Sequence, residues 1–130
     1  MIDSYTRKLF ISAACFNVLA GLPLLVALRP VAALLGLQIT PTSTLFIQLT
    51  TCLVIVFGWA YWMIARDPLH YRPYILLGII LKVLFVVVVY GHWLAGSIPW
   101  PLPVAASGDI VYALLFWRYF QRAERRTTSC

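Results

Sequence analysis

The sequence predicts an all-α fold, a transmembrane bundle of four helices with a short interfacial segment after the first helix. Of the 130 residues, 62% are hydrophobic and only 11% are charged, whereas soluble domains carry about a quarter charged residues. A chain of this length has too little interior to bury so much apolar surface in water. The composition therefore excludes an ordinary soluble enzyme, a disordered chain and a disulfide-stapled secreted module.

The four predicted spans are residues 9–28, 45–65, 74–93 and 104–120, and they form a single domain, 1–130. A helix that crosses a bilayer needs roughly 20 mostly apolar residues. The runs are too evenly apolar for the alternating pattern of membrane β-barrel strands. The fourth run is the shortest, but the basic tail, residues 121–130, can continue its helix into the headgroup region.

The connections between the spans differ in character. Residues 31–37 are apolar but too few to span, so we expect a short amphipathic helix at the outer interface. Between the second and third spans, Pro68 stops one helix and Pro73 suits the first turn of the next. The third connection holds prolines at alternate positions, 99–103, which favours an extended segment without helix.

Positive charge is distributed unequally between the two sides of the predicted bundle. One side collects eight arginine and lysine residues, and the other has only Arg29. Because loops rich in Lys and Arg stay in the cytoplasm, we predict a bacterial inner-membrane protein with both termini cytoplasmic. The net charge of +6 then faces anionic lipid headgroups. It does not indicate a nucleic-acid partner, since no interleaving of aromatic and basic residues accompanies it. The eight residues are Arg7, Lys8, Arg66, Arg72, Arg118, Arg122, Arg125 and Arg126.

Polar residues inside the apolar spans are the most informative feature of the sequence. Asn17, Lys82 and Asp109 each lie eight positions from the predicted cytoplasmic edge of their helix. At about 1.5 Å per residue, this is roughly 12 Å into a hydrocarbon core about 30 Å thick. In the second span, the same depth corresponds to Phe57 and Gly58. Three polar groups at one depth indicate a layer.

Helical spacing predicts which side chains face one another in this layer. Residues three or four apart share a helix face, and small residues on that face allow helices to approach closely. With these faces inward, Lys82 lies beside Asp109, and Asn17 and Tyr112 can complete hydrogen bonds. The faces are Ala13, Asn17 and Gly21 in the first helix, Gly78 and Lys82 in the third, and Ala105, Asp109, Tyr112, Ala113 and Phe116 in the fourth.

The layer is open to more than one interpretation. A lone charge at that depth costs about 2.5–3.5 kcal/mol on insertion scales, and pairing offsets much of this cost. In one interpretation, Lys82 and Asp109 form a site for a ligand, a proton or an ion. In another, they are a buried pair that sets the register of the helices. In a third, Lys82 extends toward the cytoplasm and Asp109 caps a helix that begins near Ser107.

Aromatic residues gather at the end of the second span, where Trp59, Tyr61 and Trp62 precede Arg66. Such residues commonly form the aromatic belt at the membrane interface. The alternative is an aromatic wall for a flat apolar ligand such as a quinone or a sterol-like lipid.

The cysteine and histidine residues do not indicate a metal or haem site. Cys15, Cys52 and Cys130 form no CxxC pair and have no ligand spacing to His70 or His92. We expect the cysteines within the spans to be small apolar packing residues in the interior. No metal and no cofactor is therefore predicted.

Residues 58–82, GWAYWMIARDPLHYRPYILLGIILK, are followed later by Gly108 and Asp109 and an aromatic-rich last helix. In this the chain resembles small four-helix bacterial inner-membrane proteins of DoxX-like type. The resemblance implies a four-helix integral membrane protein without an agreed activity, and it transfers no catalytic residue.

The sequence therefore predicts a small polytopic inner-membrane protein that is not an enzyme. It lacks a serine–histidine–carboxylate set, an HExxH motif and a glycine-rich phosphate loop. The expected partners are membrane lipids, a lipid-like ligand, and a second copy of the chain or a larger membrane protein. The alternative function is a subunit that translocates protons or a small solute through the pair of Lys82 and Asp109.

Overall fold

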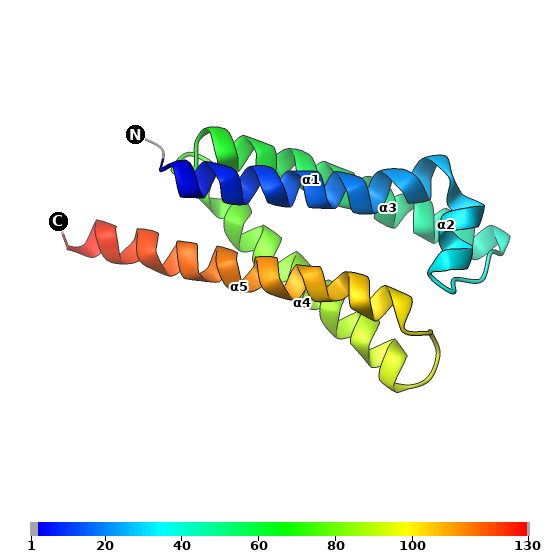
Figure 1. Cartoon of the computed structure of the whole chain (residues 1–130). Coiled ribbons are helices and arrows are strands. Elements are labelled where there is room, and N and C mark those ends of the chain that lie inside the picture. The colour runs from blue at the N-terminus through cyan, green and yellow to red at the C-terminus, as the bar shows by residue number, and fades with distance from the viewer. Residues whose placement is uncertain (1–2, 130) are drawn as a thin grey trace.

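The computed structural model describes residues 3–129, and within this range the chain forms helices and no strands, which confirms the all-α prediction. Four helices are long and one is short, and together they make an elongated molecule (Figure 1). The short helix overlaps the segment that we expected to form an interfacial helix. In chain order the helices are α1 (Ser4–Val26), α2 (Leu28–Leu34), α3 (Pro41–Arg66), α4 (Arg72–Leu94) and α5 (Pro101–Thr128).

Capping extends the long helices beyond the apolar runs that predicted them. The Asp3 carboxylate accepts a hydrogen bond from the Tyr5 N–H and caps α1. At the start of α3, the side chains of Thr40 and Ser43 each accept a hydrogen bond from the other residue's N–H, on either side of Pro41. Such caps satisfy N–H groups that have no partner inside the helix.

The prediction of an extended, proline-rich third connection is wrong in part. Helix α5 begins at Pro101, and Pro103 lies in its first turn, so only Pro99 belongs to the connection. The physical reason is that the N–H groups of a first helical turn have no intrahelical partner, and proline loses nothing there. The early start also excludes a helix that begins near Ser107 with Asp109 as its cap.

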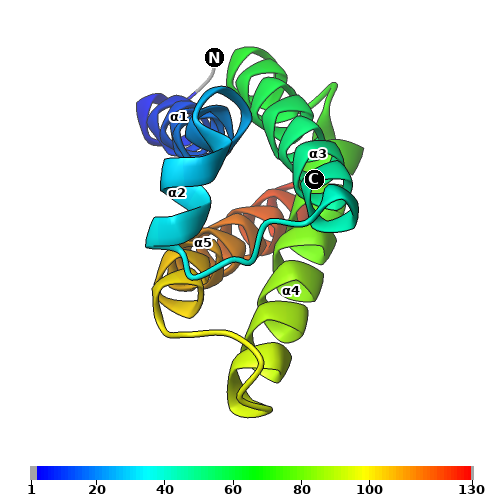
Figure 2. The same ribbon diagram turned by 90° about the vertical axis from the view of Figure 1, so that its right-hand side faces the viewer.

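The long helices form two antiparallel pairs. Helix α1 packs most extensively on α3, and α4 packs on α5, whereas contacts between the two pairs are sparser (Figures 1 and 2). Both termini lie at one end of the molecule, together with the turn between α3 and α4, and α2 lies at the opposite end. We call these the terminal end and the α2 end.

At the α2 end, the connections of the two pairs meet. Gly36, with φ +70°, lies so close to Pro99 that a methyl group on its Cα would stand 2.0 Å from the proline Cγ. Glycine alone combines this backbone conformation with so close an approach. The two pairs are thus in contact at this end through a loop.

An aromatic core joins all four long helices in the half of the molecule next to the terminal end. Phe10 of α1 stacks on Phe116 of α5, with ring centroids 4.7 Å apart. Tyr61 of α3 meets the same phenylalanine edge-on at 5.1 Å, and Ile75 of α4 is fully buried beside them. Large side chains therefore fill the space where the two pairs come together.

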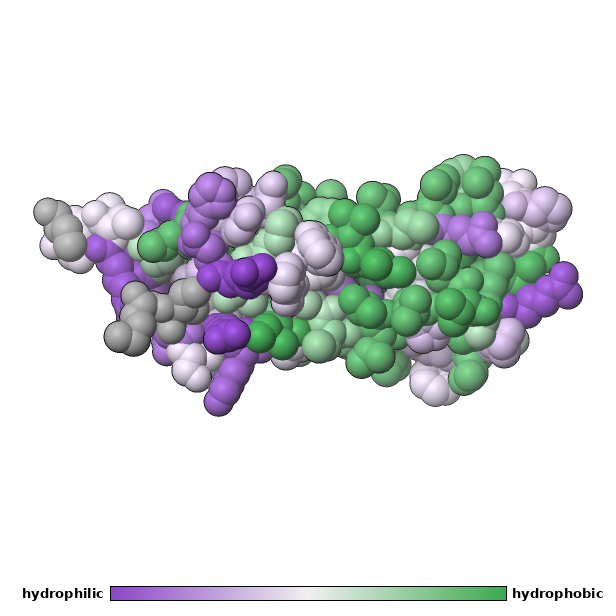
Figure 3. Space-filling view, turned by 90° about the horizontal axis from the view of Figure 1, so that it is seen from above, coloured by the Kyte–Doolittle hydropathy of each residue, from purple (hydrophilic) through white to green (hydrophobic). Residues whose placement is uncertain are grey.

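The outer surface is apolar around the middle of the molecule. Leu19, Val87 and Leu114 are 71%, 61% and 59% exposed, and hydrophilic residues gather at the terminal end (Figure 3). Within residues 3–129, α1, α3 and α4 are long and apolar enough to cross a membrane. Helix α5 is not among these three; it carries Asp109 in its apolar part and a charged segment after Trp117.

The expectation that the cysteines pack in the interior is wrong for the two that the structure describes. Cys15 and Cys52 are exposed on α1 and α3, because the inward positions of these helices are taken by neighbours such as Ala14 and Thr51. Cys130 lies outside the described residues.

Candidate functional site

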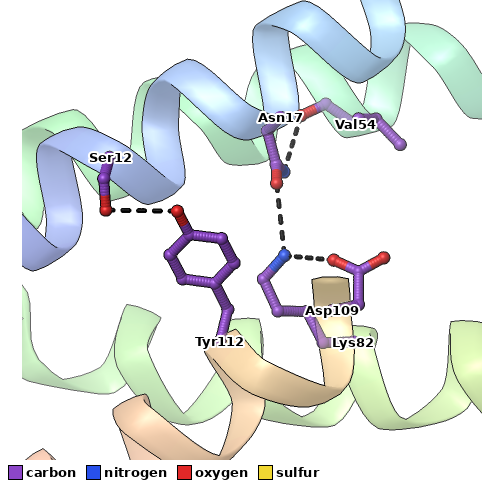
Figure 4. Close-up of polar contacts among 6 residues, drawn as sticks. All are labelled: Ser12, Asn17, Val54, Lys82, Asp109 and Tyr112. Carbon is purple, nitrogen blue, oxygen red and sulfur yellow. Dashed lines mark hydrogen bonds and ion pairs between the residues drawn. The ribbon is translucent and has the colours of Figure 1, made fainter. Parts of the chain in front are cut away.

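A chain of polar contacts runs through the interior and touches each of the four long helices. The Lys82 ammonium of α4 forms an ion pair with the Asp109 carboxylate of α5 and donates to Asn17 Oδ1 of α1 at 3.2 Å. Asn17 Nδ2 in turn donates to the backbone carbonyl of Val54 in α3, at 3.1 Å (Figure 4). The predicted layer of Asn17, Lys82 and Asp109 is confirmed as a set of direct contacts.

The contact with Val54 depends on the absence of a side chain at position 58. A helical side chain leans toward the helix N-terminus and covers the preceding turn, so a side chain at residue 58 would shield the Val54 carbonyl. At Gly58 a methyl group would lie 3.3 Å from Asn17 Cβ and 3.3 Å from the Ala14 carbonyl oxygen. Gly58 therefore lets α1 approach α3 and leaves the carbonyl open to the asparagine amide.

The Lys82 ammonium is enclosed by aromatic rings as well as by its polar partners. The nitrogen lies 5.5 Å from the ring centroid of Phe16, 5.3 Å from that of Tyr61 and 5.5 Å from that of Tyr112. The faces of aromatic rings attract cations at such distances. The side chain is only 3% exposed, so the ion pair, the amide and the three rings replace water around this charge.

Two glycine residues allow these rings to close over the lysine. A methyl group at Gly78 would lie 2.7 Å from Tyr61 Cε1, and one at Gly108 would lie 2.6 Å from Phe16 Cζ. Carbon atoms that are not covalently bonded do not approach so closely. The role of Gly78 beside Lys82 was predictable from the sequence. The contacts of Phe16 and the Val54 carbonyl were not predicted, although Gly108 and Gly58 mark them in the sequence.

The prediction for Tyr112 is wrong in its partner. Its hydroxyl group donates to the Ser12 hydroxyl at 3.2 Å and not to the layer, while its ring faces Lys82 (Figure 4). On α5 the predicted stripe is wrong only at its first position, because Ala105 is exposed and Ala106 is buried, whereas Ala113 and Phe116 are buried as predicted and Asp109 is partly buried. Asp109 thus sits at the edge of the buried face, and its side chain keeps 14% exposure.

The predicted aromatic wall does not form as one surface. Tyr61 is fully buried in the core, and its hydroxyl has no hydrogen-bond partner within residues 3–129, whereas Trp59 and Trp62 are 62% and 39% exposed. Residues two apart lie on nearly opposite faces of a helix, so position 61 turns inward when position 59 turns outward. Only the two tryptophans remain together, with ring centroids 5.1 Å apart.

These tryptophans line a pocket at the terminal end, between the last turns of α3 and the turn that leads to α4. The Arg66 guanidinium lies 5.0 Å from the Trp62 ring centroid, and the His70 and Tyr71 rings meet edge-on at 4.7 Å. We call this the aromatic pocket. Its volume is about 620 Å³, and it is lined by Trp59, Trp62, Met63, Arg66, Asp67, His70 and Tyr71.

The aromatic pocket combines apolar side chains with the polar side chains of Arg66, Asp67 and His70. The indole rings and Met63 offer surface for a flat apolar body, and Arg66 and His70 offer N–H donors beside it. No group of three or more His, Cys, Asp or Glu side chains within residues 3–129 is arranged to hold a metal ion.

Comparison with protein-family models, curated protein sequences and solved structures finds no match to this chain.

Proposed function

We propose that this chain is a four-span integral protein of the bacterial inner membrane with both termini in the cytoplasm, related to the DoxX-like proteins that it resembles. Three apolar helices support a membrane location. Helix α5 runs antiparallel to α4 and bonds to it through Lys82 and Asp109. We infer that α5 crosses with α4, because this pairing neutralises the charge that lowers its apolar character.

We propose that the protein is a binding protein for a lipid-like molecule and that the aromatic pocket is the binding site. The observation that carries the proposal is the pairing of exposed Trp59 and Trp62 with Arg66 and His70 around one space of about 620 Å³. Pockets for small ligands combine mostly apolar walls with a few convergent polar groups. The ligand that fits has a flat apolar body and hydrogen-bond acceptors at one edge, as an isoprenoid quinone has.

The geometry of Lys82 supports a structural role for the polar network. Its ammonium group has an ion-pair partner, an amide partner and three aromatic neighbours. Lys82 lines neither the aromatic pocket nor the pocket on the other side of the turn between α3 and α4. A group so fully bonded stabilises one arrangement of the helices. The network therefore acts by holding the pocket-bearing α3 in place.

A translocating subunit is the second candidate, and the partial exposure of Asp109 favours it. In that case, vesicles that contain the protein show pH-dependent uptake of protons or solute, and Asp109→Asn abolishes it. Unchanged uptake in this variant would exclude the second candidate.

Native mass spectrometry of gently extracted protein tests the binding function, with decylubiquinone as the added probe. We expect the wild-type protein to retain one lipid-like molecule or to take up the quinone. Trp62→Ala should lower the retained fraction about tenfold, because it removes one aromatic face of the pocket. Trp117→Ala is the matched control, since Trp117 is 44% exposed on α5 and does not line the pocket.

Equal losses in both tryptophan variants would contradict the assigned site. A wild-type spectrum with only the bare chain, in the presence of the quinone, would contradict the binding function itself. The same spectrum reports the number of subunits, and so shows directly whether a second copy accompanies the ligand.

A further inference from the structure

A second pocket lies on the other side of the turn between α3 and α4. It has a volume of about 570 Å³ and is enclosed by the start of α1, by the turn, and by the last part of α5. It shares only Asp67 with the aromatic pocket. We call it the arginine pocket, after Arg118, Arg122 and Arg126, which line it.

The three arginine side chains come from one face of one helix. They recur every fourth residue, so they stand above one another over two turns of α5. Within residues 3–129, the one ion pair joins Lys82 and Asp109, so none of the three guanidinium groups forms an ion pair with a carboxylate of this part of the chain. Their positive charge is directed toward the pocket that they line.

The two carboxylates in the pocket wall each accept a hydrogen bond from a nearby backbone N–H. Asp3 Oδ1 accepts from the Tyr5 N–H at 3.4 Å, as the cap of α1. Asp67 Oδ1 accepts from the His70 N–H at 3.2 Å, within the turn. Both acids keep their charge, but three guanidinium groups outnumber two carboxylates in the lining, so the pocket keeps a net positive charge.

The remaining lining fits an anion that carries several oxygen atoms. The hydroxyl-bearing side chains of Thr6 and Tyr119 line the same space, and Leu69 and Leu115 give it an apolar side. Guanidinium groups present a planar fork of N–H donors that matches phosphate oxygens. We propose that the arginine pocket binds a phosphate group, supplied by a phospholipid headgroup or by a soluble phosphate compound.

A simpler role for these arginines makes a different prediction. Basic residues near a helix C-terminus complement the helix dipole, and basic residues beside a membrane attract anionic lipids without any defined site. Arg125 would serve either purpose as well as Arg122, because it lies on the same turns of α5. It does not line the pocket, and the two residues therefore form a matched pair for the test.

The experiment uses the full chain in lipid nanodiscs, with two probes. In the first arm, native mass spectrometry counts phosphatidylglycerol molecules retained from discs of phosphatidylcholine with added phosphatidylglycerol. In the second arm, calorimetry measures binding of inorganic pyrophosphate to discs of phosphatidylcholine alone. Circular dichroism of each variant shows that the helices are intact.

We expect wild-type protein to bind in at least one arm. Arg122→Gln should weaken that binding about tenfold or more, as the loss of a charge-assisted hydrogen bond does. Arg125→Gln should change it only about twofold, because a charge outside the pocket acts through screening solvent. Binding in the lipid arm alone identifies the headgroup as the source of the phosphate, and binding of pyrophosphate identifies recognition of the phosphate itself.

Two results would overturn the proposal. Equal weakening by Arg122→Gln and Arg125→Gln would show general attraction without a site, and the absence of binding in both arms would show that the pocket takes no phosphate. Neither result affects the measurement of quinone binding in the aromatic pocket, because that binding depends on Trp62. The two proposed sites are therefore tested independently.

Discussion

The two helix pairs are held together by different means. Helices α1 and α3 touch backbone to backbone at glycines, whereas α4 and α5 are joined by polar side chains. The first pair is therefore destabilised when atoms are added at its glycine contacts, and the second is destabilised when one side chain of a polar pair is removed. A membrane-spanning segment gains little from apolar contacts between helices, since lipid is equally apolar, and these are the two remaining ways to make the association of helices specific.

Close approach in the first pair occurs at both halves of the contact. A methyl group at Gly21 would lie 3.0 Å from Ile55 Cγ1 and 3.3 Å from the Thr51 carbonyl oxygen. At Gly58 the Ala14 carbonyl oxygen would be 3.3 Å away. Small residues on facing helices thus bring the two backbones together along much of their length.

In the second pair, polar contacts occur at two depths. Lys82 pairs with Asp109, and nearer the α2 end the hydroxyl groups of Tyr90 and Ser107 lie 2.6 Å apart. Gly91, in the same helix, faces open space: apart from its own stretch of helix, no atom of residues 3–129 lies within 4 Å of an added methyl group. Specific bonds, and not close backbones, therefore set the register of α4 against α5.

The largest effect is expected where the second pair loses one partner of its charges. Lys82→Met leaves the Asp109 carboxylate, which is only 14% exposed, without its cation. It should lower the free energy of unfolding by about 3–5 kcal/mol. Equilibrium unfolding of the detergent-solubilised protein, followed by tryptophan fluorescence, measures this loss.

The double variant Lys82→Met with Asp109→Leu sharpens this prediction. It removes both charges, and its free energy of unfolding should return to within about 1 kcal/mol of the wild-type value, because apolar residues of similar size replace buried ion pairs at little cost. A double variant as unstable as Lys82→Met would show that the two groups do not act as a pair.

An intermediate effect is expected where the first pair gains atoms. Gly58→Val forces α1 away from α3 and covers the Val54 carbonyl that Asn17 uses, and it should cost roughly 1–3 kcal/mol in the free energy of unfolding. Gly91→Val is the matched control, because it adds the same atoms at a position that faces open space. Equal destabilisation by both substitutions would refute the close-contact account of the first pair.

The smallest effect is expected from the second polar contact of α4 and α5. Tyr90→Phe removes one hydroxyl group from the hydrogen bond with Ser107 and keeps the ring, so the loss should be about 0.6 kcal/mol, the average for hydrogen bonds between membrane helices. The same unfolding measurement applies, with Tyr74→Phe as a control at a tyrosine of α4 that is 38% exposed. A loss above that of Gly58→Val would show that this hydrogen bond contributes more to stability than the close approach of α1 and α3.

Much of the fold was predictable because helix formation in this chain is a local matter. The apolar runs locate the long helices, and the prolines and caps at their ends lie within a few residues of the observed boundaries. The depth of Asn17, Lys82 and Asp109 follows from counting along each helix. Burial of opposite charges in apolar surroundings then requires them to meet, as they do.

The sequence by itself thus determined which residues are helical and which polar groups share a level, since both depend on spacing along one helix. Only the tertiary structure decided how each helix is rotated about its axis, because the rotation depends on side chains far away in the chain. That rotation turns Tyr61 inward and Trp62 outward. It also places the Tyr112 hydroxyl where it donates a hydrogen bond to Ser12, and it brings Arg66 and His70 to one pocket. The spacing of residues along a single helix does not decide between these rotations about the helix axis, and packing against the neighbouring helices does.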